Sequence, residues 1–190
     1  MDVCIIKYNA GNCASVANAL ARLGIAATVS DDPELIRGAP RVIFPGVGHA
    51  ATAMTYLRAR GLDRVISSLS QPFLGICLGL QLLCEASEEG DTACLGIFPH
   101  RVRRFTGSLK VPHMGWNDVA LAGSGLGAGT HYFYFLHGYR ADTGPCTVAT
   151  GDYGGDFSAI MRRDNYLAVQ FHPEKSGKAG ANLLREFAGS

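Results

Sequence analysis

Residues 71–84 read QPFLGICLGLQLLC and place Cys77 between two glycines, at the join of two apolar runs. The run up to Ile76 has the apolar character of a buried strand, and the run from Leu80 to Cys84 reads as a helix. The pattern therefore predicts a strand, a sharp turn and a helix, with Cys77 at the turn. A strand followed directly by a helix is typical of α/β proteins.

The pentapeptide Gly75-Ile76-Cys77-Leu78-Gly79 has the spacing of a nucleophile elbow, with cysteine in the place of serine. Glycines two positions before and after the nucleophile let the strand and helix pass closely. The helix N-terminus favours a thiolate at Cys77, and the backbone N–H of Leu78 points where an oxyanion would form. A buried structural cysteine accounts for the pentapeptide about equally well.

A histidine and a carboxylate follow 95 residues after Cys77, where the segment 169–175 reads VQFHPEK. A cysteine nucleophile needs a base within hydrogen-bond reach and a third group that orients the base. His172 and Glu174 fit these roles, because Pro173 fixes the chain between them and side chains two apart in extended backbone share a face. This second motif favours a catalytic Cys77 over a structural one.

The remaining chain predicts an α/β fold in two parts. The first half alternates strands and helices, as in a parallel sheet. After Gly90 the chain is rich in short extended runs, which favours antiparallel additions to the sheet. Ser176 is expected to cap a final helix. The predicted elements are a strand at 3–8, a helix at 15–23, a strand at 25–29, a turn at 31–33, a strand at 41–44, a helix around 50–57, a segment at 62–69, and extended runs at 95–97, 102–105, 116–119, 132–136, 147–150, 159–161 and 167–171.

In both motifs and in their order, the chain resembles the class I, triad-type glutamine amidotransferases. Within that family it is similar, over essentially its whole length, to the glutaminase subunits of imidazole glycerol phosphate synthases of histidine biosynthesis. The segments that carry this likeness are PGVG at 45–48, VPHMGWN at 111–117 and YFLHGY at 134–139. The resemblance implies a three-layer α/β fold in one domain, residues 1–190. Its central sheet is expected to be mostly parallel, with antiparallel additions in the C-terminal half.

The resemblance also implies a role for each motif. The mechanism would be acyl transfer from glutamine through a thioester, with no metal or organic cofactor, and the ammonia would pass to a cyclase subunit of (β/α)8-barrel type in a heterodimer. The implied residues are Cys77, His172 and Glu174 for catalysis; Val47 and Leu78 for the oxyanion hole; Gly46, Gln81, His137, Gly138 and Tyr139 for glutamine; and Asn12, Pro112, Met114, Trp116 and Lys175 for the partner interface.

Two positions depart from the pattern of the family. Lys7 stands where an aspartate is more usual, which affects local contacts near the interface. Gly138 stands where serine or threonine is frequent, so that only its backbone is left to contact glutamine.

Several alternatives stay open at this stage. Trp116 could be a core aromatic, His113 and His137 could be structural histidines, and residues 45–48 could be an ordinary loop. The chain could instead serve another synthase, such as pyridoxal phosphate synthase. It could also be a non-catalytic interaction protein on the same fold, which would be expected to have lost Cys77, His172 or Glu174.

Composition narrows the partners and the location. The net charge is +1 with the basic residues scattered, so neither a nucleic acid nor a charged membrane surface is expected as a partner. None of the six cysteines has C-x-x-C spacing, which favours reduced thiols in a cytoplasmic protein. The N-terminal residues have neither the pattern of a signal peptide nor that of a membrane segment.

Overall fold

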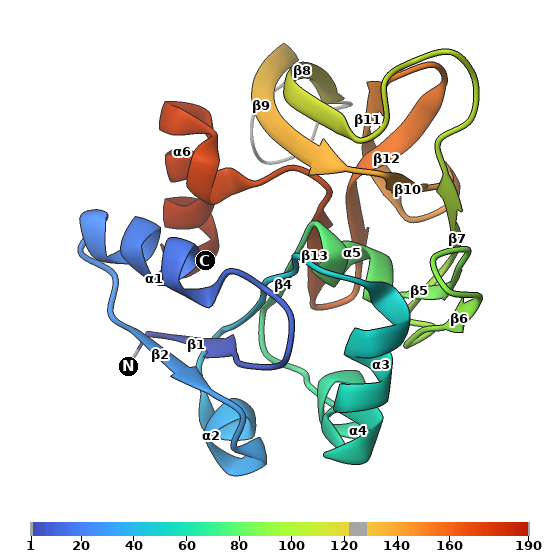
Figure 1. Cartoon of the computed structure of the whole chain (residues 1–190). Helices are drawn as coiled ribbons and strands as arrows, with labels where there is room; N and C mark the ends of the chain where they lie inside the picture. The colour runs from blue at the N-terminus through green and yellow to red at the C-terminus, as the bar shows by residue number, and fades with distance from the viewer. Residues whose placement is uncertain (1, 122–128, 190) are drawn as a thin grey trace.

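Five parallel strands form the first part of a large sheet, in the order β2-β1-β3-β4-β13 (Figure 1). This computed structural model describes residues 2–121 and 129–189. Every side-chain position of β1, β3 and β4 is buried, as the near-continuous apolar runs of parallel strands indicate. The bounds are β1 Val3–Ile6, β2 Ala27–Ser30, β3 Val42–Phe44, β4 Phe73–Ile76 and β13 Tyr166–Val169.

Helices cover both faces of these strands (Figure 1). Alternate residues of β1 point to opposite faces, so Cys4 packs with one set of helices and Ile5 with the other. The resulting three layers confirm the predicted fold class. One face is covered by α1 (Cys13–Arg22) and α6 (Gly177–Gly189), and the other by α2 (Pro33–Gly38), α3 (Ala50–Ala59), α4 (Leu62–Ser67) and α5 (Leu78–Leu83).

Four antiparallel strands extend the sheet beyond β13, in the order β12-β11-β8-β9. They confirm the predicted antiparallel additions in the C-terminal half. Their bounds are β8 His113–Leu121, β9 Gly129–His137, β11 Thr147–Asp152 and β12 Asp156–Arg163.

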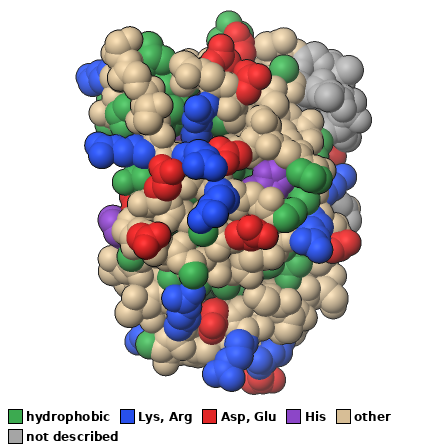
Figure 2. Space-filling view, turned by 90° about the vertical axis from the view of Figure 1, so that its right-hand side faces the viewer, with side chains coloured by type: hydrophobic (Ala, Val, Ile, Leu, Met, Phe, Trp, Pro, Cys, Tyr) green, Lys and Arg blue, Asp and Glu red, His purple; other side chains and the backbone are tan. Residues whose placement is uncertain are grey.

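A second, four-stranded sheet lies beside the first, in the order β10-β7-β5-β6, and was not predicted. Figure 2 views the molecule from the side of this smaller sheet and shows basic and acidic side chains interspersed. Arg103, for example, lies 2.7 Å from Asp142 and 3.4 Å from Glu88. The strands are β5 Cys84–Ser87, β6 Thr92–Ala93, β7 Phe98–Arg104 and β10 Tyr139–Ala141.

The structure differs from the predicted elements at four places. The turn predicted at 31–33 leads into helix α2, which was not predicted and which forms because the Asp32 side chain accepts a hydrogen bond from the N–H of Glu34 and Pro33 suits the first helical position. Helix α5 ends at Leu83, and Cys84 already belongs to β5. Residues 95–97 connect β6 to β7 and are not a strand. Ser176 stands directly before α6 as expected, but its hydroxyl donates to the carbonyl of His172 and accepts from the N–H of Tyr134, so its side chain does not cap the helix.

Within the described residues, no helix has the length and apolar character needed to cross a bilayer.

Candidate active site

Cys77 occupies a strained turn between β4 and α5. Its φ of 53° and ψ of −107° lie outside the regions that non-glycine residues ordinarily adopt. A Cβ at Gly79 would lie 2.1 Å from the carbonyl oxygen of Phe44, and one at Gly75 would lie 2.8 Å from Leu83. Both positions therefore need glycine for the close passage that the sequence predicted.

The functional segments meet because β3, β4 and β13 are neighbours in the sheet. Residues 45–48 follow the carboxyl end of β3, Cys77 follows that of β4, and His172 comes shortly after β13. The N–H of Cys77 donates to the carbonyl of Val169 at 2.8 Å, which ties the elbow to the strand that leads to His172. Ligands in open α/β sheets bind at this edge.

His172 and Glu174 form a buried pair. Nδ1 of His172 lies 2.8 Å from Oε1 of Glu174, and both side chains are 2% exposed. Their expected extended backbone was wrong: residues 173–175 form a 3-10 turn, which still brings the carboxylate back to the imidazole. Burial alone would lower the pKa of His172, but the Cys77 thiolate and the Glu174 carboxylate raise it to about 10.

The proton on His172 is therefore held between two anionic groups. Nδ1–H donates to Glu174, and Nε2 is buried without a hydrogen-bond partner among the residues that the structure describes. In its thiol form Cys77 donates to the carbonyl of Leu136, with Sγ 3.6 Å from that oxygen, whereas in its thiolate form its charge acts on His172. Nε2 is left as the nitrogen that can exchange a proton with Sγ.

The predicted oxyanion donors are not both free in this conformation. The N–H of Leu78 donates to the carbonyl of Gly46 at 3.3 Å. Because the C=O and N–H of a trans peptide point in opposite directions, the N–H of Val47 points away from Leu78. The carbonyl of Val47 accepts a bond from Gly11 at 2.8 Å, which holds the loop in place.

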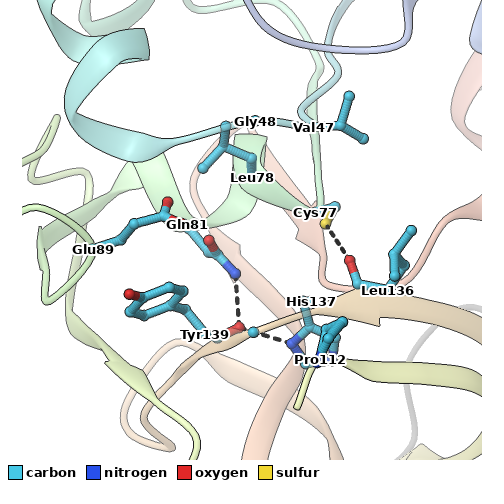
Figure 3. A pocket seen from close by; sticks show the side chains of 11 residues that line it. Val47, Gly48, Cys77, Leu78, Gln81, Glu89, Pro112, Leu136, His137 and Tyr139 are labelled. Atoms are coloured by element: carbon cyan, nitrogen blue, oxygen red, sulfur yellow. Dashed lines mark hydrogen bonds between the residues drawn. The ribbon is translucent and has the colours of Figure 1, made fainter.

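A cavity of about 230 Å³ lies beside Cys77, which forms part of its wall (Figure 3). Of the residues expected to bind glutamine, Gln81, His137, Gly138 and Tyr139 line it, whereas Gly46 packs behind Leu78 and Gly79. The full lining is Val47, Gly48, Cys77, Leu78, Gln81, Glu89, Pro112, Leu136, His137, Gly138 and Tyr139.

Sequence analysis missed Glu89, which contributes the carboxylate of this lining. Its Oε2 accepts a hydrogen bond from the N–H of Ala50 at 2.7 Å, at the first residue of α3. The sequence signal was weak, because an acidic pair before Gly90 is also typical of an exposed turn.

The residues expected at a partner interface are mostly at the surface. Met114 is 60% exposed and Trp116 is 56% exposed, so the core alternative for Trp116 was wrong. Pro112 and Lys175 are also exposed. Asn12 is half-buried, and its side chain accepts from the N–H of Ser15 and caps α1, so its place at the interface stays a prediction.

The model of the family described as glutamine amidotransferase class-I matches residues 5–189. The chain belongs to this family. The amidotransferase is 49% identical over 193 residues to the imidazole glycerol phosphate synthase subunit HisH of Bacteroides fragilis (strain YCH46), with 98% of each chain covered. It is 46% identical over 194 residues to the subunit of the same name from Yersinia pseudotuberculosis serotype I (strain IP32953), again with 98% of each covered.

Solved structures agree on the fold of the amidotransferase. A crystal structure described as a glutamine amidotransferase matches with a TM-score of 0.78 at 24% identity, covering all of both chains. The structure of PurLQS from Thermotoga maritima matches with a TM-score of 0.76 at 16% identity, over 98% of this chain and 97% of that one. The resemblance seen in the sequence is thus confirmed at the level of family and fold.

Proposed function

We propose that this amidotransferase is the glutaminase subunit of an imidazole glycerol phosphate synthase, which hydrolyses glutamine and passes the ammonia to a cyclase subunit in histidine biosynthesis. The observation that carries the proposal is Cys77 held at the elbow, beside the buried His172–Glu174 pair and in the wall of a cavity of about 230 Å³. Relatives 43–49% identical over nearly the whole chain support the choice of synthase.

In the proposed reaction, the Cys77 thiolate attacks the side-chain amide carbon of glutamine. His172 protonates the departing ammonia, so that a thioester remains on Cys77. His172 then takes a proton from the water that attacks the thioester. Glu174 keeps Nδ1–H of His172 directed to itself, so that Nε2 serves both proton transfers. The products are glutamate, ammonia and the regenerated thiolate.

The cavity lining supports a binding mode for glutamine. Gln81 and Glu89 would face its α-amino end, because a carboxylate and an amide oxygen attract an ammonium group. The backbone of residues 137–139 would contact the side that leads to Cys77. Without a hydroxyl at Gly138, this contact comes from the main chain alone.

The oxyanion hole would be completed only after a change in residues 45–48. A flip of the peptide between Gly46 and Val47 would release the N–H of Leu78 and bring the N–H of Val47 beside it. Glycine at position 46 accepts the change of ψ at little steric cost. The free subunit is then a poor glutaminase, and partner binding switches it on.

The partner surface is proposed to be the outer face of the β8–β9 hairpin. We define the docking surface as Met114, Trp116, Tyr132 and Lys175, which are all exposed. It lies beside the cavity, because Met114 is the register partner of Leu136, whose carbonyl holds Cys77 Sγ. A cyclase of (β/α)8-barrel type docked here would receive the ammonia close to where it forms.

A cytoplasmic location and a single domain stay predictions.

The test is glutamate release from L-glutamine by the chain alone, with the cyclase subunit of the same organism, and with a pyridoxal phosphate synthase subunit. We expect activity that needs the cyclase and is absent in Cys77→Ala. Stimulation by the second partner only would favour the alternative synthase. No hydrolysis with either partner would contradict the glutaminase assignment and favour a non-catalytic interaction protein.

A further inference from the structure

Two buried histidines lie beside the cavity and outside the triad. His113 on β8 and His137 on β9 are register partners and are 3% and 5% exposed. Nδ1 of His113 is 3.0 Å from Nε2 of His137. His113 is stacked between Tyr153 and Phe135, with ring centroids 4.0 and 5.1 Å away. In such an aromatic cluster, a ring nitrogen without a partner would be costly.

The hydrogen bond between His137 and the backbone of Tyr139 fixes which nitrogen of His137 carries the proton. Nδ1 of His137 lies 2.7 Å from the carbonyl oxygen of Tyr139. A carbonyl only accepts, so Nδ1 of His137 must be protonated and donate. Nε2 of a neutral His137 must then accept, which requires Nδ1–H on His113 as the donor.

The hydrogen bonds of Asn117, on the other side of His113, independently fix the same direction of donation. The amide nitrogen of Asn117 donates to the carbonyl of Asp152 at 2.8 Å, and its oxygen accepts from the N–H of Asp118 at 2.8 Å. This orientation leaves the second N–H of Asn117 for Nε2 of His113, at 3.4 Å. Each group in this hydrogen-bond network therefore donates to the next, from Asn117 to His113, from His113 to His137, and from His137 to the carbonyl of Tyr139.

Both rings are neutral near pH 7. Burial lowers the pKa of His113 to about 4 and that of His137 to about 3. An extra proton would also turn an accepting ring nitrogen into a donor that faces another donor. Each of the two rings is thus held in one tautomer.

The Tyr139 end of this hydrogen-bond network reaches the proposed glutamine site (Figure 3). The carbonyl of Tyr139 accepts a second hydrogen bond from Nε2 of Gln81 at 2.8 Å. The other hydrogen of that Nε2 is directed to Oε1 of Gln170, 3.1 Å away. Because both hydrogens are used, Gln81 turns its amide oxygen, and not its nitrogen, toward the substrate.

We propose that His113 and Asn117 are positioning residues for glutamine: they hold His137 in its Nδ1–H tautomer, which fixes the Tyr139 carbonyl and thereby the orientation of the Gln81 amide. The proposal rests on the glutamine-binding role proposed above for Gln81. Neither His113 nor Asn117 is among the residues that line the cavity, so both act through His137.

Nitrogen-15 NMR of the imidazole rings of the full chain tests the tautomers without any activity assay. We expect His113 and His137 each to show Nδ1 protonated and Nε2 unprotonated between pH 6 and 8. In His113→Phe, the Nε2 resonance of His137 should move away from its hydrogen-bonded position. A protonated Nε2 on either ring in the native protein overturns the proposal, whether or not the protein hydrolyses glutamine.

Kinetics with the partner present tests positioning against simple structural support. His113→Phe keeps an aromatic ring but no donor, so KM for glutamine should rise about tenfold while kcat changes less than about threefold. His113→Gln restores an N–H donor and should recover most of the KM.

The matched control is His100→Phe. His100 is also 3% exposed, with Nδ1 2.9 Å from the carbonyl of Asp142 and Nε2 accepting from the N–H of Cys146, but it belongs to the smaller sheet. This variant should lose comparable thermal stability and leave KM unchanged. Equal KM effects in His113→Phe and His100→Phe, or no recovery in His113→Gln, would reduce His113 to a structural role. An inactive native protein would instead count against the proposed function.

Discussion

Gly46→Ala should abolish the stimulation of glutaminase activity by the partner. A Cβ at position 46 would lie 2.4 Å from the N atom of Gly79 and 2.5 Å from the Cβ of Leu78. Ordinary contacts begin near 3.4 Å, so residues 45–48 must retreat by about 1 Å. The atoms met are backbone and Cβ atoms, so no side-chain rotation relieves the overlap.

The size of the effect follows from the role of the loop. A loop displaced by about 1 Å cannot bring the N–H of Val47 into line with that of Leu78, and losing one oxyanion donor typically costs ~10²–10³ in turnover. Turnover by the free subunit, which already lacks the Val47 donor, should change much less. The ratio of stimulated to basal rate should therefore fall by about two orders of magnitude, with KM for glutamine less affected.

The assay is steady-state glutamate release by the free subunit, by the complex, and by the complex with the cyclase ligand bound. Gly138→Ala is the control within the cavity, because its Cβ would meet only Val111 at 3.7 Å, an ordinary contact. Gly38→Ala controls for the general effect of the substitution, since nothing lies within 4 Å of its Cβ. If Gly46→Ala folds, binds the cyclase and retains full stimulation, the gating argument fails.

Three further predictions concern the triad and the docking surface. Cys77→Ala should abolish glutamate release with little change in melting temperature. The glutamine analogue 6-diazo-5-oxo-norleucine should label Cys77 but not Cys4, since burial raises the pKa of Cys4 to about 11. Labelling of Cys4, detected by mass spectrometry, would contradict this. Glu174→Gln should lower the pKa of His172 from about 10, because the carboxylate that favours the imidazolium is gone. The alkaline limb of its kcat/KM profile should move to lower pH and kcat should fall ~10²–10⁴-fold, whereas an unmoved limb would exclude Glu174 as the orienting group. Trp116→Ala should weaken cyclase binding in calorimetry by about 2 kcal/mol or more, with Leu35→Ala, an exposed residue of α2, as the inert control; equal affinities in the two variants would remove Trp116 from the docking surface.

The elbow and the triad candidates could be predicted from sequence because their signals are local. The two glycines around Cys77 indicate that backbone segments pass closely at the turn, and His172 and Glu174 are only two residues apart. Helix α2 was missed because Asp32-Pro33 is typical of a turn as well as of a helix start. Strand β5 was missed because Cys84 continues the apolar run of α5 and is followed by residues with little strand preference.

Contacts between distant segments could not be predicted in the same way. Glu89 reaches the cavity only because it meets the N-terminus of α3, 39 residues earlier in the chain. The pairing of His113 with His137 depends on the register of β8 against β9, which no residue pattern in either strand specifies. The docking surface depends on the same register, since it decides that Tyr132 of β9 lies on the face of β8 that carries Met114 and Trp116.

The pairing of β4 with β13 has a consequence for how activity arises during synthesis. These strands are neighbours in the sheet, yet Cys77 and His172 are 95 residues apart in the chain. At the usual rate of translation, roughly 5–20 s separate the emergence of the nucleophile from that of its base. Throughout this interval the nascent chain has a cysteine but no partner to take its proton. Ammonia release thus waits for the last strand of the parallel set to dock.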